Sequence, residues 1–352
     1  MKILISIEHP AWAHQFKYII RELKSQGHDV KVVAIHKDIA LNLLDLFDIP
    51  YQNISDSSGK NILEKGCIFL STTLKIYKIC RQYHPDIFIG RASPMMAINS
   101  YIFKKPHILF EDTEASKFSL FICKYCSDII ITSSSFKMNL GNKQKRICAY
   151  KELFYLHPSR FTPNPVVLSE LGLTEKDTYF ILRFVSFEAH HDIGQSGIKD
   201  KRKLVETLIK YGRVFITSEG SLPEELEKYR IRISPEKIHD LMAYATLCVG
   251  ESPTMATEAA CLGVHAVLIS TIYHGYNEEL ERKYGLITII NPNMLSEISA
   301  LNKIESLIQD PLLREKNKAQ LQKVLLDSCS PSEEMLNIIN STLHIQTESE
   351  KK

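Results

Sequence analysis

The chain has 352 residues, which is long for one domain and predicts two α/β domains. Its hydrophobic fraction of 44% and charged fraction of 24% are typical of a soluble globular protein, and a formal net charge of +2 gives no general case for nucleic acid binding. No apolar run is long enough to span a membrane, the N-terminus lacks a signal-peptide pattern, and eight scattered cysteines suit a reducing cytoplasm, so we expect a cytoplasmic protein.

The first apolar run, residues 2–7, predicts a buried parallel strand, followed by a polar loop and a helix that ends at Gly27. A second strand comes next and completes a βαβ unit. The unit has no G-x-G-x-x-G, which disfavours a dinucleotide, and we expect no cofactor. The loop carries His9 and His14 at the edge where open α/β sheets bind ligands. His14 is a candidate general base or phosphate ligand, and the alternative is a capping or packing histidine.

Residues 56–84 predict a helix that carries Lys75, Lys78 and Arg81 among apolar side chains. A basic amphipathic helix can lie on an anionic membrane surface, which would place the protein at the inner face of the membrane. A solvated helix face is the interpretation we favour, and peripheral membrane contact stays an alternative.

Three carboxylates, Glu111, Asp112 and Glu114, follow the predicted strand in HILFEDTEAS. Their position just past an apolar strand favours a role at the sheet edge over packing. They are candidates for binding sugar hydroxyls, for acting as a general base, or for capping the next helix.

After residue 151 the chain becomes rich in proline and aromatic residues, which indicates a connection between domains. A second alternation of strands and helices begins at Tyr179. We therefore predict two Rossmann-like domains with parallel sheets facing across a cleft. The predicted boundaries are residues 1–160, residues 161–335, and a helix end with a polar tail at 336–352.

The loop after the first strand of the second half is rich in polar residues. It follows Arg183 and contains Glu188, His190, His191 and Asp192. Adjacent residues seldom converge on one ion and no H-x-x-x-H spacing is present, so we expect no metal site. Phosphate or acceptor binding by Arg183 and a histidine is the favoured interpretation, and the alternative is a turn that caps a helix.

The segment GESPTMATEAACLG, residues 250–263, predicts a polar turn and an Ala-rich helix between two buried strands. The amides at such a helix start favour phosphate. Glu258, one turn into the helix, is a candidate for hydrogen bonds from a ribose, or it complements the helix dipole. His239 begins the preceding helix, where it is a candidate for a base or phosphate contact, or for a cap.

Six segments occur in this order along the chain: HPAWAHQF, FEDTEAS, YKELFYLHP, RFVSFEAHHDIG, EKIHDLMAYA and GESPTMATEAACLG. Together they resemble the prokaryotic domain-of-unknown-function family 354 over roughly residues 1–335. That family is grouped with the two-domain GT-B glycosyltransferases and the non-hydrolysing UDP-N-acetylglucosamine 2-epimerases. The resemblance therefore implies a GT-B-like fold and a nucleotide-sugar ligand.

The wider relatives imply roles for individual residues. Ser252, Thr254, Met255 and Glu258 match the epimerase pattern D-S-G-G-x-x-E-E, which implies diphosphate contacts from the turn and a ribose contact from Glu258. Pro253 and Thr254 stand where glycines would be, and Pro253 removes an N–H donor.

The other matches concern the chemistry at the sugar. FEDTEAS resembles H-V-E-A-G-L, which implies Glu111 or Glu114 as an acid or base, and RFVSFEAHHD stands at H-R-x-E-N, which implies Arg183 and Glu188 near the substrate. The epimerase G-T-R-P-E is replaced by EHPAWAH. This replacement disfavours an epimerase, and because glycosyltransferases of this fold often have a histidine near that position, the resemblance implies His14 as base.

The resemblance thus implies a metal-independent glycosyltransferase that transfers a sugar from a nucleotide diphosphate, most simply UDP, to a glycan or lipid-linked acceptor in surface polysaccharide synthesis. Helix-start amides, Arg183 and a histidine such as His190 or His239 would stabilise the departing diphosphate. A sugar-nucleotide epimerase and a non-catalytic sugar-nucleotide binding protein are the alternatives.

Overall fold

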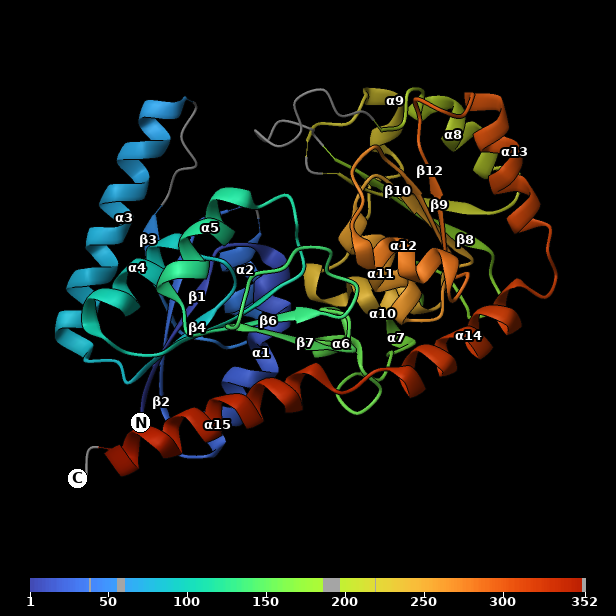
Figure 1. The fold of residues 1–352 in the computed structure, drawn as a ribbon. Coiled ribbons are helices and arrows are strands. Elements are labelled where there is room, and N and C mark those ends of the chain that lie inside the picture. Colours follow the sequence, from blue (N-terminus) through green and yellow to red (C-terminus); the bar gives the residue numbers. More distant parts are fainter. Residues whose placement is uncertain (38, 56–60, 186–196, 219, 350–352) are drawn as a thin grey trace. The chain divides into compact units, whose positions relative to one another are not determined.

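The computed structural model describes residues 1–37, 39–55, 61–185, 197–218 and 220–349. These residues divide into two compact units (Figure 1). The N-terminal unit comprises Met1–Tyr155 together with the C-terminal segment from Cys329, and the C-terminal unit comprises Leu156–Ser328. Across the described residues, no helix combines the length and the hydropathy needed to cross a membrane.

The N-terminal unit is built on a seven-stranded sheet in the order β3-β2-β1-β4-β5-β6-β7, in which every neighbouring pair is parallel. The strands are β1 (Lys2–Ile7), β2 (Asp29–Ile35), β3 (Tyr51–Ser55), β4 (Ile87–Gly90), β5 (His107–Glu111), β6 (Ile129–Ser133) and β7 (Gln144–Ile147). The helices are α1 (Pro10–Ser25), α2 (Ala40–Leu46), α3 (Ile62–Tyr83), α4 (Pro94–Phe103), α5 (Lys117–Cys126), α6 (Leu153–Leu156) and α15 (Pro331–Ser349).

Helix packing explains why the central strands β1, β4, β5 and β6 are buried along nearly their whole length instead of alternating. Helices α3 and α4 pack on each other, and their side chains form one core cluster with Leu4, Val33 and Phe88 of the sheet. Helix α1 packs on α2 and on α15. Figure 1 shows α3, α4 and α5 grouped beside this sheet.

The C-terminal unit is built on a five-stranded parallel sheet in the order β12-β11-β10-β8-β9. The strands are β8 (Tyr179–Phe184), β9 (Arg213–Ser218), β10 (Leu247–Gly250), β11 (Ala266–Ile269) and β12 (Ile287–Ile290). The helices are α7 (Val166–Glu170), α8 (Lys201–Leu208), α9 (Glu224–Glu227), α10 (Ile238–Ala243), α11 (Pro253–Cys261), α12 (Gly275–Arg282), α13 (Glu297–Ile308) and α14 (Leu313–Asp327), with a 3₁₀ turn at Pro235–Lys237.

The predicted fold class is confirmed, since both units are parallel α/β sheets covered by helices. In each sheet the chain reverses its direction of winding once, between β1 and β4 and between β8 and β10. Ligands of open α/β sheets bind beyond the carboxyl ends of the strands at such a reversal. The topology therefore predicts that ligands bind near the residues that follow these four strands.

Candidate functional site

The turn after β10 starts helix α11 in the C-terminal unit. Ser252 is the N-cap residue, and its Oγ accepts a hydrogen bond from the Met255 amide at 3.3 Å. Pro253 follows at the first helical position, where its fixed φ suits the helix and its missing N–H costs nothing. Thr254 is half-buried in the same turn. The positive end of the helix dipole lies here, so this turn favours an anionic group.

Gly250 brings β10 into close approach with β8. A Cβ atom at this position would lie 2.7 Å from the Arg183 carbonyl oxygen and 2.8 Å from the Arg183 Cβ. Only glycine fits this approach without a shift of the neighbouring backbone. The close pairing sets Arg183 directly opposite Gly250 in the sheet.

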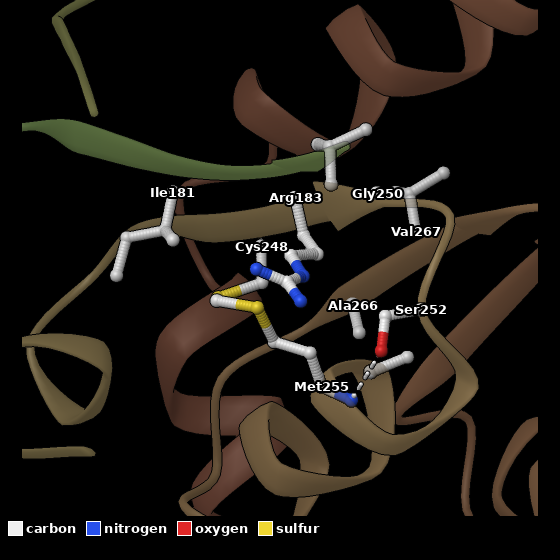
Figure 2. A pocket seen from close by; sticks show the side chains of 10 residues that line it. Ile181, Arg183, Cys248, Gly250, Ser252, Met255, Ala266 and Val267 are labelled. Carbon is white, nitrogen blue, oxygen red and sulfur yellow. Dashed lines mark hydrogen bonds between the residues drawn. The ribbon is translucent and has the colours of Figure 1, made fainter. Parts of the chain in front are cut away.

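Arg183 extends from β8 toward the first turn of α11 (Figure 2). Its Nη1 donates to Thr217 Oγ1 at 3.4 Å, and its side chain shares one small pocket with Ser252 and Met255. Three of the residues predicted to contact the nucleotide are thus brought together at one place. A guanidinium beside a helix start is an arrangement suited to a phosphate group.

Glu251 links this turn to the backbone around the polar loop. Its Oε2 accepts a hydrogen bond from the Val185 amide and its Oε1 from the Ile198 amide, each at 2.8 Å. One buried carboxylate therefore holds the two backbone positions that flank residues 186–196. Glu188 and His190, which the sequence predicts as substrate contacts, lie outside the described residues.

His239 and Glu258 form a buried pair. His239 Nε2 lies 3.0 Å from Glu258 Oε1, with 2% and 9% of the two residues exposed. The Phe161 ring meets the imidazole edge-on, with centroids 6.3 Å apart. The pair fixes the orientation of the Glu258 carboxylate, while the predicted ribose contact stays a prediction.

The N-terminal unit carries a buried charge cluster beyond the ends of β4 and β5. Arg91 forms ion pairs with Glu111 and Asp112, and Lys151 lies 3.2 Å from Asp112 Oδ2 and 3.3 Å from Glu152 Oε1. Burial disfavours both cations, but the neighbouring carboxylates outweigh it and raise the pKa of Arg91 and of Lys151. Removing one partner would leave an uncompensated buried charge, so each member of the cluster depends on the others.

Glu111 is engaged on several sides in this cluster. Besides the ion pair with Arg91, its carboxylate accepts hydrogen bonds from the amides of Ala92 at 3.3 Å, Asp112 at 3.0 Å and Thr113 at 3.0 Å. These contacts fix the position of the carboxyl group at the end of β5. Its predicted role as an acid or base stays a prediction.

Glu8 follows β1 directly, at the reversal of the N-terminal sheet. Burial raises the pKa of its carboxyl to about 7, against the nearby Ser93 and Ser6 hydroxyls and the charge of Lys37, which lower it. A carboxyl with a pKa near neutrality is suited to accept and return a proton. Sequence analysis did not select Glu8; its place immediately after the first buried strand was the available signal.

His14 and Glu114 occupy different surroundings. His14 lies in α1 and is only 6% exposed, with its ring packed 5.3 Å from that of Phe47 and 5.4 Å from that of Tyr155. Glu114 Oε1 accepts a hydrogen bond from the Lys137 amide at 3.2 Å. These contacts support a packing role for His14 and a loop-bracing role for Glu114, and their catalytic roles stay predictions.

The turn after β4 repeats the turn after β10. Gly90 ends β4, and a Cβ at this position would lie 2.8 Å from Ser6 Oγ. Ser93 is the N-cap of α4, accepts a hydrogen bond from the Met96 amide at 3.4 Å, and is followed by Pro94. The two reversals therefore share a Gly, a capping Ser and a Pro at the start of the helix. They differ in charge, because Arg91 follows the first glycine and Glu251 the second.

No family model matches the chain, and no curated protein sequence matches it. Solved structures do match over nearly its whole length. A Listeria monocytogenes protein assigned as a UDP-N-acetylglucosamine 2-epimerase has a TM-score of 0.69 at 13% identity, covering 99% of this chain and 97% of that one.

Two further structures show the range of the likeness. The UDP-GlcNAc 2-epimerase of Neisseria meningitidis bound to UDP-GlcNAc has a TM-score of 0.64 at 14% identity, covering 97% of this chain and 99% of that one. The spinosyn forosaminyltransferase SpnP has a TM-score of 0.62 at 11% identity, covering 97% and 99%. The chain thus has the fold shared by UDP-GlcNAc 2-epimerases and GT-B glycosyltransferases.

Proposed function

We propose that the protein is a glycosyltransferase that binds a nucleotide-diphosphate sugar, with UDP as the nucleotide, in its C-terminal unit. The observation that carries the proposal is the grouping of Arg183 with the capped start of α11 at the reversal between β8 and β10. A structure of the same fold holds UDP-GlcNAc. In this proposal the helix start and Arg183 bind the diphosphate, and Glu258, oriented by His239, accepts hydrogen bonds from the ribose.

The N-terminal unit is assigned the acceptor and the proton transfer. An acceptor hydroxyl that attacks the anomeric carbon must lose its proton to a base. Glu8 suits this role because its carboxyl has a pKa of about 7, whereas Glu111 is held by Arg91 and by three backbone amides. The departing diphosphate is stabilised by positive groups that require no metal ion, namely the helix start and Arg183.

A thermal-shift titration tests nucleotide binding directly. We expect UDP and UDP-sugars to raise the melting temperature without added magnesium, because ligand binding stabilises the folded state. Absence of a shift with every nucleoside diphosphate would contradict the proposal. Replacing Arg183 by Met should weaken UDP binding by roughly 10- to 100-fold, the size expected for one charged contact to phosphate. Arg213→Met, on β9 of the same sheet, is the matched control and should leave the affinity unchanged.

An epimerase is the second candidate, since epimerases have the higher TM-scores among the structures compared. Epimerisation at C2 exchanges the proton at that carbon with solvent, whereas transfer requires an acceptor. Incubation of a UDP-sugar with the protein in deuterated water, without acceptor, separates the two reactions. Deuterium at C2 would establish the epimerase and exclude the proposed transferase. Membership of family 354 stays a prediction.

A further inference from the structure

The outward face of α5 is unusual for a surface helix. Its exposed positions are Lys117, Phe118, Phe121, Lys124 and Tyr125, which recur at the spacing of one helical face. The three aromatic residues are 65%, 62% and 62% exposed. A surface helix ordinarily presents charged and polar residues on this face. Here the face carries three aromatic rings and two lysines.

Helix α3 continues this apolar surface. Leu63, Leu70 and Leu74 follow one another along its exposed side and are each at least 60% exposed. The rings of Phe69 and Phe118 meet with centroids 6.3 Å apart, which joins α3 to α5. Helix α4 packs against both. Its end adds Tyr101, 68% exposed, and Ile102, 51% exposed. Contiguous apolar groups of this kind mark interaction surfaces.

The charge of these three helices is strongly positive. Their sequences contain one acidic residue, Glu64, against Lys65, Lys75, Lys78, Arg81, Lys117 and Lys124. The formal charge of the whole chain is only +2, so the positive charge is concentrated on this part of the N-terminal unit. A second copy of the chain would place the same lysines against one another. A negatively charged partner is favoured.

We propose that the exposed face of α3, α4 and α5 docks the N-terminal unit onto an anionic lipid bilayer. Phenylalanine and leucine side chains enter the interface between headgroups and acyl chains, and tyrosine lies at headgroup level. The lysine stems lie along the apolar surface while their ammonium groups contact lipid phosphates. This inference does not depend on the reaction that the protein catalyses.

Vesicle flotation tests the proposal with the full-length protein. We expect it to float with vesicles of phosphatidylcholine containing about 30% phosphatidylglycerol, but not with phosphatidylcholine alone, and to be released at high salt. Failure to float with the anionic vesicles would overturn the proposal.

Two sets of variants assign the binding to this face. Replacing Phe118, Phe121 and Tyr125 together by Ser should abolish flotation. Exchanging Lys117 and Lys124 together for Gln should lower vesicle partitioning by about 10- to 30-fold, since each lysine near an anionic surface contributes roughly a factor of five. All five side chains are exposed, so the variants should fold, and circular dichroism checks this. Undiminished flotation of both variants would contradict the assignment.

Matched controls lie in the C-terminal unit. Met294, Ile298 and Leu326 are exposed apolar residues at 84%, 64% and 85%, and their joint replacement by Ser should leave flotation unchanged. Self-association without lipid that disappears in the aromatic variant would show that a second copy occupies this face, and would overturn the proposal.

A fluorescent reporter gives a local readout. The chain has a single tryptophan, so Phe121→Trp in a Trp12→Phe background places the only indole on the outward face of α5. Its emission should shift to shorter wavelength on addition of the anionic vesicles, because the ring leaves water. An unchanged spectrum under conditions of full flotation would show that another face binds.

Discussion

Glu8 and the carboxylates beside Arg91 lie at the same edge of the N-terminal sheet, but their burial is compensated differently. Glu111 and Asp112 are buried beside Arg91, and Asp112 is also 3.2 Å from Lys151, so opposite charges offset their desolvation. For Glu8 the burial outweighs the help from two hydroxyls and a lysine, and the pKa of its carboxyl rises. The acid with the perturbed pKa is therefore the stronger candidate for proton transfer.

The raised pKa of Glu8 predicts a pH-dependent stability. Its folded pKa of about 7 exceeds the ordinary value of 4.5, so the folded state binds the proton more tightly than the unfolded state. The stability contributed by this proton is fully present below pH 4.5 and is lost as the pH rises to about 7. Glu8→Gln should remove this loss. As the pH rises across this range, the free energy of unfolding of the variant should therefore increase relative to that of the wild type. Urea titrations at several pH values measure the difference.

The exposed Glu206→Gln variant controls for the loss of a surface charge. The pH dependence of its free energy of unfolding should match that of the wild type. A constant difference between Glu8→Gln and the wild type would show that the Glu8 carboxyl titrates normally. If Glu8 is also the base, kcat/KM of the wild type should rise as the pH passes through about 7, because the base acts when deprotonated.

Gly250 provides a second prediction at the residue scale. Gly250→Ala would force a Cβ against the backbone oxygen of Arg183 at 2.7 Å, so β10 and β8 must separate. We expect a loss of roughly 1–3 kcal/mol in the free energy of unfolding and weaker nucleotide binding. Gly66→Ala in α3, where no atom lies within 4 Å of the added carbon, should instead be neutral or stabilising. Equal stability of the two variants would contradict the close approach.

At the scale of elements, the sequence indicated the turn at Gly250 but not its partner at Gly90. Both GESPTM and GRASPMM contain Gly, Ser and Pro in this order, but an added alanine in GRASPMM shifts the serine by one position, so the two segments do not share one spacing. Both turns start a helix at a sheet reversal, with the same serine cap. Sequence patterns reveal such a turn, but the strand order that makes it a reversal depends on pairings between distant segments.

Glu251 shows why part of the candidate site could not be derived from sequence. Position 251 in a turn suggests an acid exposed to solvent, whereas the structure buries it between two amides 13 residues apart along the chain, at Val185 and Ile198. The pairing of His239 with Glu258 is similar, because the residues lie on separate helices. Tertiary packing decides both contacts.

The two hydrogen bonds that Glu251 accepts predict that even the isosteric change to Gln is destabilising. Glu251→Gln keeps one acceptor oxygen and places an NH₂ group against the second amide, which leaves a buried donor unpaired. We expect a loss of about 1–3 kcal/mol in the free energy of unfolding. Hydrogen exchange should increase at Val185 or Ile198 and stay unchanged at the Met96 amide, which Ser93 holds in the other unit. Unchanged exchange at both loop positions would contradict the bracing role.

At the scale of the whole molecule, the alternation of apolar runs with helical segments was enough to predict two parallel sheets, and this prediction is confirmed. The return of the last helix to the first sheet could not be read in this way. Buried positions along α15 indicate that it packs, but not on which unit. The contacts show Cys329 N donating to Cys148 O at 2.8 Å and Ser332 Oγ to Phe154 O at 3.1 Å, both in the N-terminal unit.

This return predicts that α15 stabilises the N-terminal unit specifically. Ile339 is fully buried and Ile345, on the same helix, is 68% exposed, so the same substitution tests both environments. Ile339→Ala should lower the free energy of unfolding of the N-terminal unit by about 2–5 kcal/mol through lost burial and a cavity, and Ile345→Ala by less than about 0.5 kcal/mol. Hydrogen exchange should accelerate in β1, α1 and α6 of the Ile339 variant, while β8 to β12 keep wild-type protection. Faster exchange in the C-terminal sheet instead would contradict the prediction, because a helix stabilises the core into which its side chains are packed.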